Sequence, residues 1–198
     1  MTSPIAIDIL ASGEISEVLP ALAALRIRVF RDWPYLYDGD PGYERAYLQT
    51  YIASPRAAVI VARDGDAIIG ASTCLPLASE TANVQKPFLD AGREVRDIFY
   101  FGESVLDTKY RGRGIGVRFF DLREAHARSF HSYTTAAFCA VQRPDDHPMR
   151  PPGYTKLDAF WMRRGYARQP GLQCRMSWRD LGEAEESEKT LTFWTKTL

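Results

Sequence analysis

Three glycines within five positions mark the stretch Val105-Leu-Asp-Thr-Lys-Tyr-Arg111-Gly-Arg-Gly114-Ile-Gly116. The pattern indicates a strand that runs into a glycine loop, with a helix beginning directly after it. Glycines allow successive backbone N–H groups to converge, and a helix N-terminus adds about half a positive charge. Arg111 and Arg113 add full charges with fork-shaped donors. The stretch predicts a phosphate-binding loop, and the alternative is a tight strand-to-helix turn that needs positive φ.

Two common phosphate motifs fit this loop poorly. A P-loop ends in Gly-Lys-Ser/Thr, whereas this loop ends in Gly-Ile-Gly. A dinucleotide fingerprint needs a further glycine where Phe119 stands, and it follows the first strand of a parallel βαβ unit. Here a β-hairpin with Asp64-Gly65 at its turn is predicted ahead of the loop. The loop therefore calls for a different phosphate ligand.

Hydrophobic periodicity predicts the elements around the loop. Strands are expected at 5–9, 57–63, 67–77, 97–106, 134–141, 172–178 and 190–196, and helices at 14–31, from 41, at 116–130 and at 154–164. Pro20 must then lie in the first turn of its helix or kink it, and Gly102 indicates a bulge or a close backbone approach inside its strand. The order predicts one mixed α/β domain over residues 1–198, in which 183–198 form an acidic connector and a C-terminal strand.

The charges of the chain are balanced overall but not along its length. It has 198 residues, with 25 Lys and Arg against 25 Asp and Glu. Residues 1–90 carry seven basic and eleven acidic side chains, 91–175 carry fifteen and nine, and 176–198 carry three and five. Neutrality argues against a protein that coats nucleic acid or an anionic membrane. The basic segment contains the glycine loop, which favours an anionic ligand there.

Composition also bounds the class of protein. Hydrophobic residues make up 45% of the chain, but no window has the ~18 consecutive apolar residues of a membrane span. The start MTSPIAIDIL lacks the features of a signal peptide, and the three cysteines are scattered without a CxxC spacing. We expect a cytoplasmic globular protein with reduced thiols and no membrane or nucleic-acid partner. His126 and His131 lack the spacing of metal ligands, so no metal site is expected.

With these elements in place, the sequence resembles the GNAT superfamily of acyl-CoA-dependent N-acyltransferases. Arg111-x-x-Gly114-x-Gly116 matches the family signature Arg/Gln-x-x-Gly-x-Gly/Ala, and Phe160-Trp-Met-Arg-Arg-Gly165-Tyr166 is similar to its second motif. The order of elements matches along nearly the whole chain. The resemblance implies a mixed α/β (α+β) domain with a mostly antiparallel sheet of about seven strands and about four helices. It also implies acetyl transfer from acetyl-CoA to a primary amine by direct attack in a ternary complex.

The resemblance further implies where acetyl-CoA lies. The backbone of Val105 and Leu106 would line the pantetheine arm, in a cleft between splayed fourth and fifth strands that the bulge at Gly102 opens. The residues whose N–H groups would hold the pyrophosphate are Arg111, Gly112, Arg113, Gly114, Ile115 and Gly116.

Two side chains are candidates for proton transfer. Glu103, on the strand just before the loop, is the candidate general base or water-relay carboxylate, and its alternative is an ion-paired strand residue. Many GNAT members protonate the leaving thiolate with a Tyr where this chain has Trp161, whose indole cannot act as an acid at neutral pH. Tyr154, expected at the start of the same helix, is the nearest substitute, and its alternative is a packing role. This departure also supports a second hypothesis, a catalytically silent acyl-CoA-binding sensor or partner module.

The acceptor would lie against the first two helices and their connecting loop. This wall offers the rings of Phe30, Trp33, Tyr35 and Tyr37 and the carboxylates of Asp38 and Asp40. Aromatic faces with carboxylates suit a cationic or aromatic amine of a small molecule or peptide. The same residues could instead hold the two helices together.

The sequence leaves further alternatives open. His147 could be a base or substrate contact, or an exposed residue of an Asp-Asp turn, and Cys139 with His147 and Asp146 could form a thiol triad. A nucleotide-binding regulator would also use the loop. The last strand could pair within the chain or across a homodimer.

Overall fold

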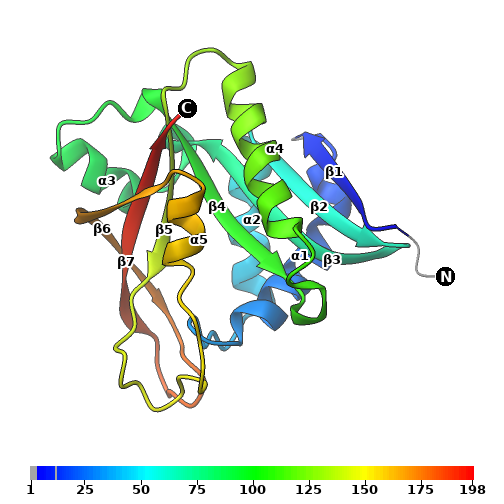
Figure 1. Ribbon diagram of the computed structural model, residues 1–198, viewed down its shortest axis with the longest axis vertical. Helices are drawn as coiled ribbons and strands as arrows, with labels where there is room; N and C mark the ends of the chain where they lie inside the picture. The colour runs from blue at the N-terminus through cyan, green and yellow to red at the C-terminus, as the bar shows by residue number, and fades with distance from the viewer. Residues whose placement is uncertain (1–3, 12) are drawn as a thin grey trace.

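The computed structural model describes residues 4–11 and 13–198, which form a single seven-stranded sheet (Figure 1). Its order is β1-β2-β3-β4-β5-β7-β6, and neighbouring strands are antiparallel except for β4 and β5. The strands are β1 (Ala6–Ala11), β2 (Ala58–Asp64), β3 (Ala67–Pro76), β4 (Ile98–Leu106), β5 (Thr135–Val141), β6 (Ala167–Trp178) and β7 (Ser187–Thr197). The helices are α1 (Ile15–Phe30), α2 (Pro41–Ala53), α3 (Ala82–Asp90), α4 (Ile115–Ser129) and α5 (Asp158–Arg163). This confirms the predicted mixed, mostly antiparallel fold.

Helices cover both faces of the sheet. In Figure 1, α4 and α5 lie in front of the strands, and α1 and α2 lie behind them. Val59 belongs to the core under α1 and α2, whereas its neighbour Ile60 belongs to the core under α4. Successive side chains of a strand point to opposite faces. A central strand such as β2 must therefore be apolar at consecutive positions, as its sequence is.

The start of α2 follows the predicted capping pattern. The Asp40 carboxylate accepts a hydrogen bond from the Tyr43 N–H at 2.6 Å, and Pro41 occupies the first helical position. From this start, Tyr43, Tyr47 and Tyr51 follow one another at i, i+4 spacing, with ring centroids 6.4 and 5.8 Å apart. The cap thus fixes a row of tyrosines that leads toward β4.

The one parallel pair of strands separates along its length. Only Ile98, Phe99 and Tyr100 of β4 pair with β5, opposite Thr135, Ala136 and Ala137. Beyond these residues the two strands diverge, which confirms the predicted splay.

A bulge lies just past the point of separation. Phe101 faces Cys74 on β3 and Ser104 faces Ser72, so Gly102 and Glu103 together oppose Thr73. A Cβ atom at Gly102 would clash with the Tyr51 hydroxyl and would lie 2.5 Å from Thr73 Oγ1. The predicted bulge at Gly102 is confirmed, and close approach of Tyr51 explains why the position requires glycine.

The structure corrects several local predictions. The polar stretch before β4 contains α3, which Phe88 anchors against Phe193 of β7 at 4.7 Å between ring centroids. The prediction that a helix begins at Tyr154 is wrong, because the Tyr154 N–H donates to Pro151 O in a turn and α5 begins only at Asp158. Of the two alternatives for Pro20, the first-turn position is wrong, because Pro20 lies inside α1.

The C-terminal strand resolves another alternative. β7 pairs with both β5 and β6 of the same chain. Over residues 4–11 and 13–198, the structure has no helix that is long and apolar enough to cross a membrane.

Candidate functional site

A cavity of about 870 Å³ runs along the splay between β4 and β5. Its walls come from the glycine loop, the separated strand ends, the segment that follows α1, and the loop between β5 and α5. Its lining includes Phe30, Trp33, Tyr35, Glu103, Leu106, Arg111, Gly112, Gly114, Gly116, Arg123, Cys139, Arg143, Tyr154, Trp161 and Arg168. The glycine loop and Glu103 thus face the same space.

The glycine loop has the backbone conformation that its sequence predicts. Gly112 and Gly114 adopt φ values of 77° and 80°, and Gly114 is the N-cap residue from which α4 starts. The first N–H groups of a helix have no partner within it, so the start of α4 provides unpaired donors at this end of the cavity. A Cβ atom at either glycine would meet no atom of the described chain within 4 Å. The surface over the loop is therefore open for a ligand.

The other residues predicted to hold the cofactor divide into two groups. Arg111 and Leu106 line the cavity with the glycines, whereas the side chains of Val105 and Ile115 are buried in the two cores. Arg113 stacks over the Tyr110 ring at 5.0 Å and does not line the cavity. Of the two arginines of the loop, Arg111 is therefore the one placed to contact a phosphate.

Glu103 lies on the bulge and faces the α1–α2 side. Its Oε2 accepts hydrogen bonds from the hydroxyls of Tyr47 at 3.1 Å and Tyr51 at 3.4 Å. Its Oε1 lies 2.8 Å from Arg26 Nη1. The predicted base candidate therefore does line the cavity, but as a member of a buried network with three donors.

Arg26 connects two buried carboxylates. Its Nε donates to Glu44, whose side chain is fully buried, and its guanidinium stacks over the Tyr47 ring at 4.5 Å. Burial alone would lower the pKa of Arg26, but Glu103, Tyr47 and Glu44 together outweigh it and raise that pKa well above its usual value. Burial, with the charge of Glu103, also raises the pKa values of Tyr47 and Tyr51. Both tyrosines remain protonated donors at neutral pH.

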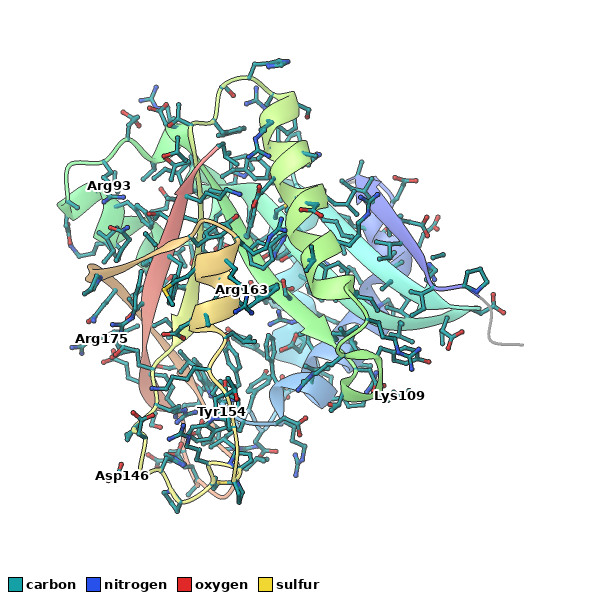
Figure 2. All side chains as sticks on the ribbon, viewed as in Figure 1. Arg93, Lys109, Asp146, Tyr154, Arg163 and Arg175 are labelled. Carbon is teal, nitrogen blue, oxygen red and sulfur yellow. The ribbon has the colours of Figure 1, made fainter. Side chains whose placement is uncertain are left out.

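Trp161, at the usual position of the acid, and Tyr154, its candidate substitute, both line the cavity. Trp161 packs between Phe138 and Trp194, each at 5.1 Å between ring centroids, and forms an apolar wall. Tyr154 lies in the loop that precedes α5 (Figure 2), edge-on to Trp33 at 6.0 Å. Burial, and then the nearby Asp158, raise the pKa of Tyr154. The hydroxyl therefore keeps its proton at neutral pH, as an acid must.

The predicted acceptor wall is only partly present. The rings of Phe30 and Tyr35 lie 4.5 Å apart and line the cavity with Trp33, but Tyr37 is buried and does not line it. Neither predicted carboxylate lines the cavity: Asp38 pairs with Arg31 and Arg179, and Asp40 caps α2. The wall is therefore aromatic. Glu103, Asp145 and Asp158 are the acidic side chains that line the same cavity, and of these Glu103 is the buried one.

Comparison with known proteins rests on structure. No protein-family model matches the sequence, and no curated protein matches it. Solved structures do match over nearly the whole chain. A ribosomal-protein-alanine N-acetyltransferase from Brucella melitensis has a TM-score of 0.61 at 15% identity, covering 98% of this chain and 99% of that one. An N-acetyltransferase from Staphylococcus aureus Mu50 has a TM-score of 0.62 at 12% identity, covering 98% of this chain and 99% of that one. An acetyltransferase of the GNAT family from Streptococcus pneumoniae has a TM-score of 0.60 at 12% identity, covering 98% of this chain and 100% of that one.

The chain has the GNAT fold. This confirms the fold that the glycine signature and the order of elements predict. Identities of 12–15% establish the fold alone, so the roles of the site residues in this GNAT fold rest on their own geometry.

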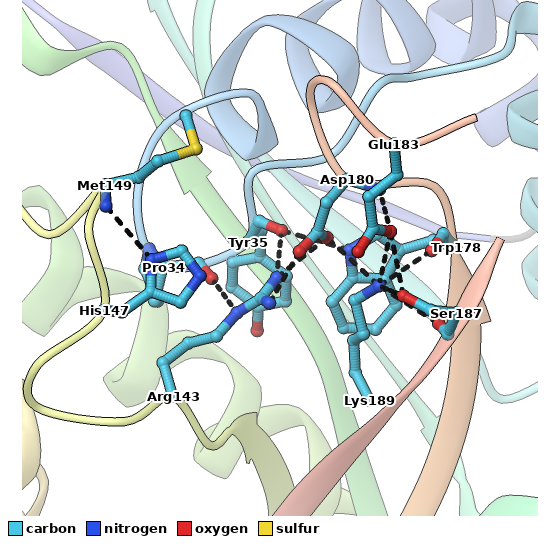
Figure 3. Close-up of polar contacts among 10 residues, drawn as sticks. All are labelled: Pro34, Tyr35, Arg143, His147, Met149, Trp178, Asp180, Glu183, Ser187 and Lys189. Atoms are coloured by element: carbon cyan, nitrogen blue, oxygen red, sulfur yellow. Dashed lines mark hydrogen bonds and ion pairs between the residues drawn. The ribbon is translucent and has the colours of Figure 1, made fainter. Parts of the chain in front are cut away.

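Arg143 links two segments that line the cavity. Its guanidinium donates to the carbonyl oxygens of Pro34 and Tyr35, both at 2.8 Å, and forms a two-pronged pair with Asp180 at 2.6 and 2.9 Å (Figure 3). Lys189 Nζ lies 3.4 Å from Asp180 Oδ1, the oxygen that also accepts from Arg143 Nη2. Arg143 and Asp180 lie 37 residues apart in the sequence and share no motif, so no local pattern predicts this pair. The contact ties the aromatic wall to the loop before α5.

His147 and Cys139 do not act together in this GNAT fold. The His147 ring lies 5.0 Å from Trp33, and its Nδ1 accepts from the Met149 N–H at 3.1 Å within the predicted turn. Cys139 Sγ instead contacts the Tyr100 hydroxyl at 3.1 Å and Cys174 Sγ at 4.0 Å. The Cys174 contact, followed by burial, raises the pKa of the Cys139 thiol well above its usual value. A protonated thiol that does not contact the imidazole is not a triad nucleophile.

Proposed function

We propose that this protein is an acyl-CoA-dependent N-acyltransferase that transfers an acetyl group from acetyl-CoA to a primary amine. The observation that carries the proposal is the continuity of the cavity from the glycine loop to Glu103. Such a reaction needs a site that binds the cofactor phosphates and a group that accepts a proton. The start of α4 and the buried Glu103 carboxylate provide these two parts beside the same splayed strands. The fold shared with several N-acetyltransferases supports the same activity.

Binding of the donor would use the glycine loop and β4. The N–H groups at the start of α4, with Arg111, would hold the pyrophosphate, because a helix N-terminus favours anions and arginine matches phosphate geometry. Gly112 and Gly114 allow close approach because no side chain stands between backbone and ligand. Leu106 would line the pantetheine arm, and the bulge would leave space for the thioester beside Glu103.

The reaction would join the amine nitrogen to the thioester carbonyl carbon and break the carbon–sulfur bond. The amine loses a proton and the leaving thiolate gains one, so no oxidant or reductant is required. Holding both substrates in one cavity supplies much of the rate, and a positioned base adds about 10²–10⁴-fold. Few side chains need to react.

Glu103 would accept the amine proton, directly or through a water, since it is the buried carboxylate of the cavity and lies at the bulge of β4. Arg26, Tyr47 and Tyr51 would act as positioning residues, because their three contacts fix the carboxylate in one orientation. Tyr154 would protonate the thiolate in place of the tyrosine that Trp161 replaces. The acceptor amine, from a small molecule or a peptide, would lie against Phe30, Trp33 and Tyr35.

Two measurements on the intact protein test this function. Acetyl-CoA titration calorimetry measures donor binding, and an acetylation assay with a panel of small amines and peptide N-termini measures turnover. Binding with turnover on at least one amine is expected. Binding without turnover would favour the silent acyl-CoA-binding module, which Trp161 in the wall supports. Absence of acetyl-CoA binding would exclude both functions.

A further inference from the structure

Arg123 of α4 is a buried cation that forms no ion pair with any carboxylate of the described residues. Its residue is 2% exposed, and it lines the cavity. In the described part of the chain, no Asp or Glu oxygen lies within 4 Å of its guanidinium. Arg26, at a similar depth, has two such partners. The two arginines therefore differ in what neutralises them.

The neighbours of Arg123 leave most of its donors unused. The guanidinium lies over the rings of Phe101 at 4.5 Å and Phe120 at 4.7 Å. Its Nε donates to the Phe119 carbonyl at 3.3 Å, and across the described residues neither terminal nitrogen has a hydrogen-bond acceptor. The adjacent Glu124 is already bound to Arg128, Tyr166 and Lys196. The described residues therefore provide neither a counter-ion nor acceptors for the terminal nitrogens of Arg123.

A buried cation without a counter-ion carries a desolvation penalty. Guanidinium stays charged in proteins, and taking an ion out of water is unfavourable when no counter-ion accompanies it. Burial lowers the pKa of Arg123, which reports the same penalty. A ligand group of opposite charge in the cavity would remove it. The site therefore favours an anion over a neutral group.

The position of Arg123 indicates which part of a ligand would reach it. It lies nine residues beyond Gly114 along α4, a rise of about 14 Å from the phosphate-binding end. It contacts Phe101, the residue before the bulge, so it stands at the inner end of the splay. A ligand with phosphate at the loop and thioester beside Glu103 would extend its acyl chain toward this end. The other enclosed cations of the cavity are engaged, Arg143 with Asp180 and Arg150 with Asp145.

We propose that Arg123 binds a carboxylate at the end of the acyl group, so that the preferred donor is the CoA thioester of a three- or four-carbon dicarboxylic acid. The inference rests on the proposed N-acyltransferase function, and it replaces acetyl with a dicarboxylic acyl group as the preferred group transferred. The transfer itself is unchanged: the amine takes the acyl carbon, the thiolate leaves, and the distal carboxylate stays ionised throughout.

Paired donors that differ only at the chain end test the inference. Succinyl-CoA and butyryl-CoA have equally long chains that end in a carboxylate and in a methyl group. Calorimetry should show that the wild-type protein binds succinyl-CoA at least tenfold more tightly than butyryl-CoA. Arg123→Met should bring this ratio close to one, Arg123→Lys should retain part of it, and free CoA should bind equally to all three proteins.

Arg168→Met is the matched control, because it removes one positive charge from the exposed β6 wall of the same cavity. It should keep the succinyl preference. Because replacing an unpaired buried ion with an apolar side chain removes its desolvation penalty, Arg123→Met should fold without loss of stability, which a melting curve checks. A wild-type ratio near one, or an equal loss of free CoA and succinyl-CoA binding in Arg123→Met, would overturn the inference alone. Failure of free CoA and all thioesters to bind would overturn the proposed function with it.

Discussion

Arg26 Nη1 on α1 lies 2.8 Å from Glu103 Oε1 on β4, and both side chains are buried. The contact joins the helix that carries the aromatic wall to the strand that lines the proposed thioester site. Separating a buried ion pair leaves both charges uncompensated, so the two side chains are held together. The pair therefore fixes where the Glu103 carboxylate can point, and the other carboxylate on Arg26, Glu44, offers a comparison that separates chemistry from packing.

Glu103→Gln should lower kcat by about 10²–10⁴-fold while leaving acetyl-CoA affinity unchanged, because it removes the proposed base and keeps the shape of the side chain. Steady-state kinetics with a reactive amine measures the first effect and calorimetry the second. Glu44→Gln is the control, since it also removes a carboxylate from Arg26 but does not line the cavity. It should reduce stability and change kcat less than tenfold. Equal kcat losses in the two variants would show that Glu103 acts only through the fold.

Gly102→Ala should destabilise the protein by about 1–3 kcal/mol, because the new Cβ would overlap the Tyr51 hydroxyl. Urea unfolding measures the change. The double variant with Tyr51→Phe should recover part of this loss, since it removes the overlapping oxygen, although contact with Thr73 Oγ1 remains. If the two substitutions were simply additive, the close approach of Tyr51 would not be the reason for glycine at the bulge.

Gly114→Val should abolish acetyl-CoA binding while the protein still folds. Valine at φ 80° strains the backbone, and its side chain would project into open space where the ligand would approach. Gly182→Val is matched to it, with a φ of 86° and equally open surroundings, but it lies outside the cavity lining. Calorimetry should show full binding in Gly182→Val and none in Gly114→Val. Comparable affinities in the two variants would remove the loop assignment.

Tyr154→Phe should lower kcat by about 10²-fold or more with unchanged acetyl-CoA affinity, because the proton for the thiolate would be missing. The raised pKa of Tyr154 means that the wild-type hydroxyl stays protonated beyond about pH 10. Ionisation of Tyr154 should therefore not lower the wild-type rate below that pH. Tyr35→Phe, on the same wall, should mainly raise the KM of the amine. A normal kcat for Tyr154→Phe would leave protonation of the thiolate to solvent.

The glycine loop could be predicted because its properties are local. Positive φ at Gly112 and Gly114 and the helix start at Ile115 follow from residue types over a few positions. The bulge was predictable for the same reason, since Gly102 is unusual inside an apolar strand. In these segments local preference and the final packing agree, so the sequence is sufficient.

The networks that complete the site could not be predicted, because their members come from distant segments. Nothing near Arg26 in sequence indicates that Glu103 will lie beside it, and α3 is held by Phe88 on Phe193 despite a proline within the helix. The position of Arg123 in the sequence, by contrast, indicates that its side chain is buried. It follows Phe119 by four positions and therefore shares the buried face of α4, where a charged residue is rare.

Stability should fall in alkali because buried tyrosines must keep their protons in the folded state. Burial, followed by the nearby Cys139, raises the pKa of Tyr100 well above the value of about 10 that it has when unfolded. The contribution is complete below about pH 10, where both states hold the proton. Above that pH the unfolded chain loses the proton first, so the free energy of unfolding should fall by about 1.4 kcal/mol per pH unit for this group.

Tyr100→Phe isolates that contribution, since it keeps the ring against Phe193 and removes the ionising hydroxyl with its contact to Cys139. Urea unfolding of both proteins at several pH values between about 9 and 11 gives two curves of stability against pH, on either side of the ordinary tyrosine pKa. The wild-type curve should be steeper above about pH 10 by about 1.4 kcal/mol per pH unit, so the stabilities of the two proteins should converge or cross as pH rises. Parallel curves would mean that the Tyr100 hydroxyl ionises as easily in the folded protein as in the unfolded chain, and that solvent reaches the inner end of the β4–β5 splay.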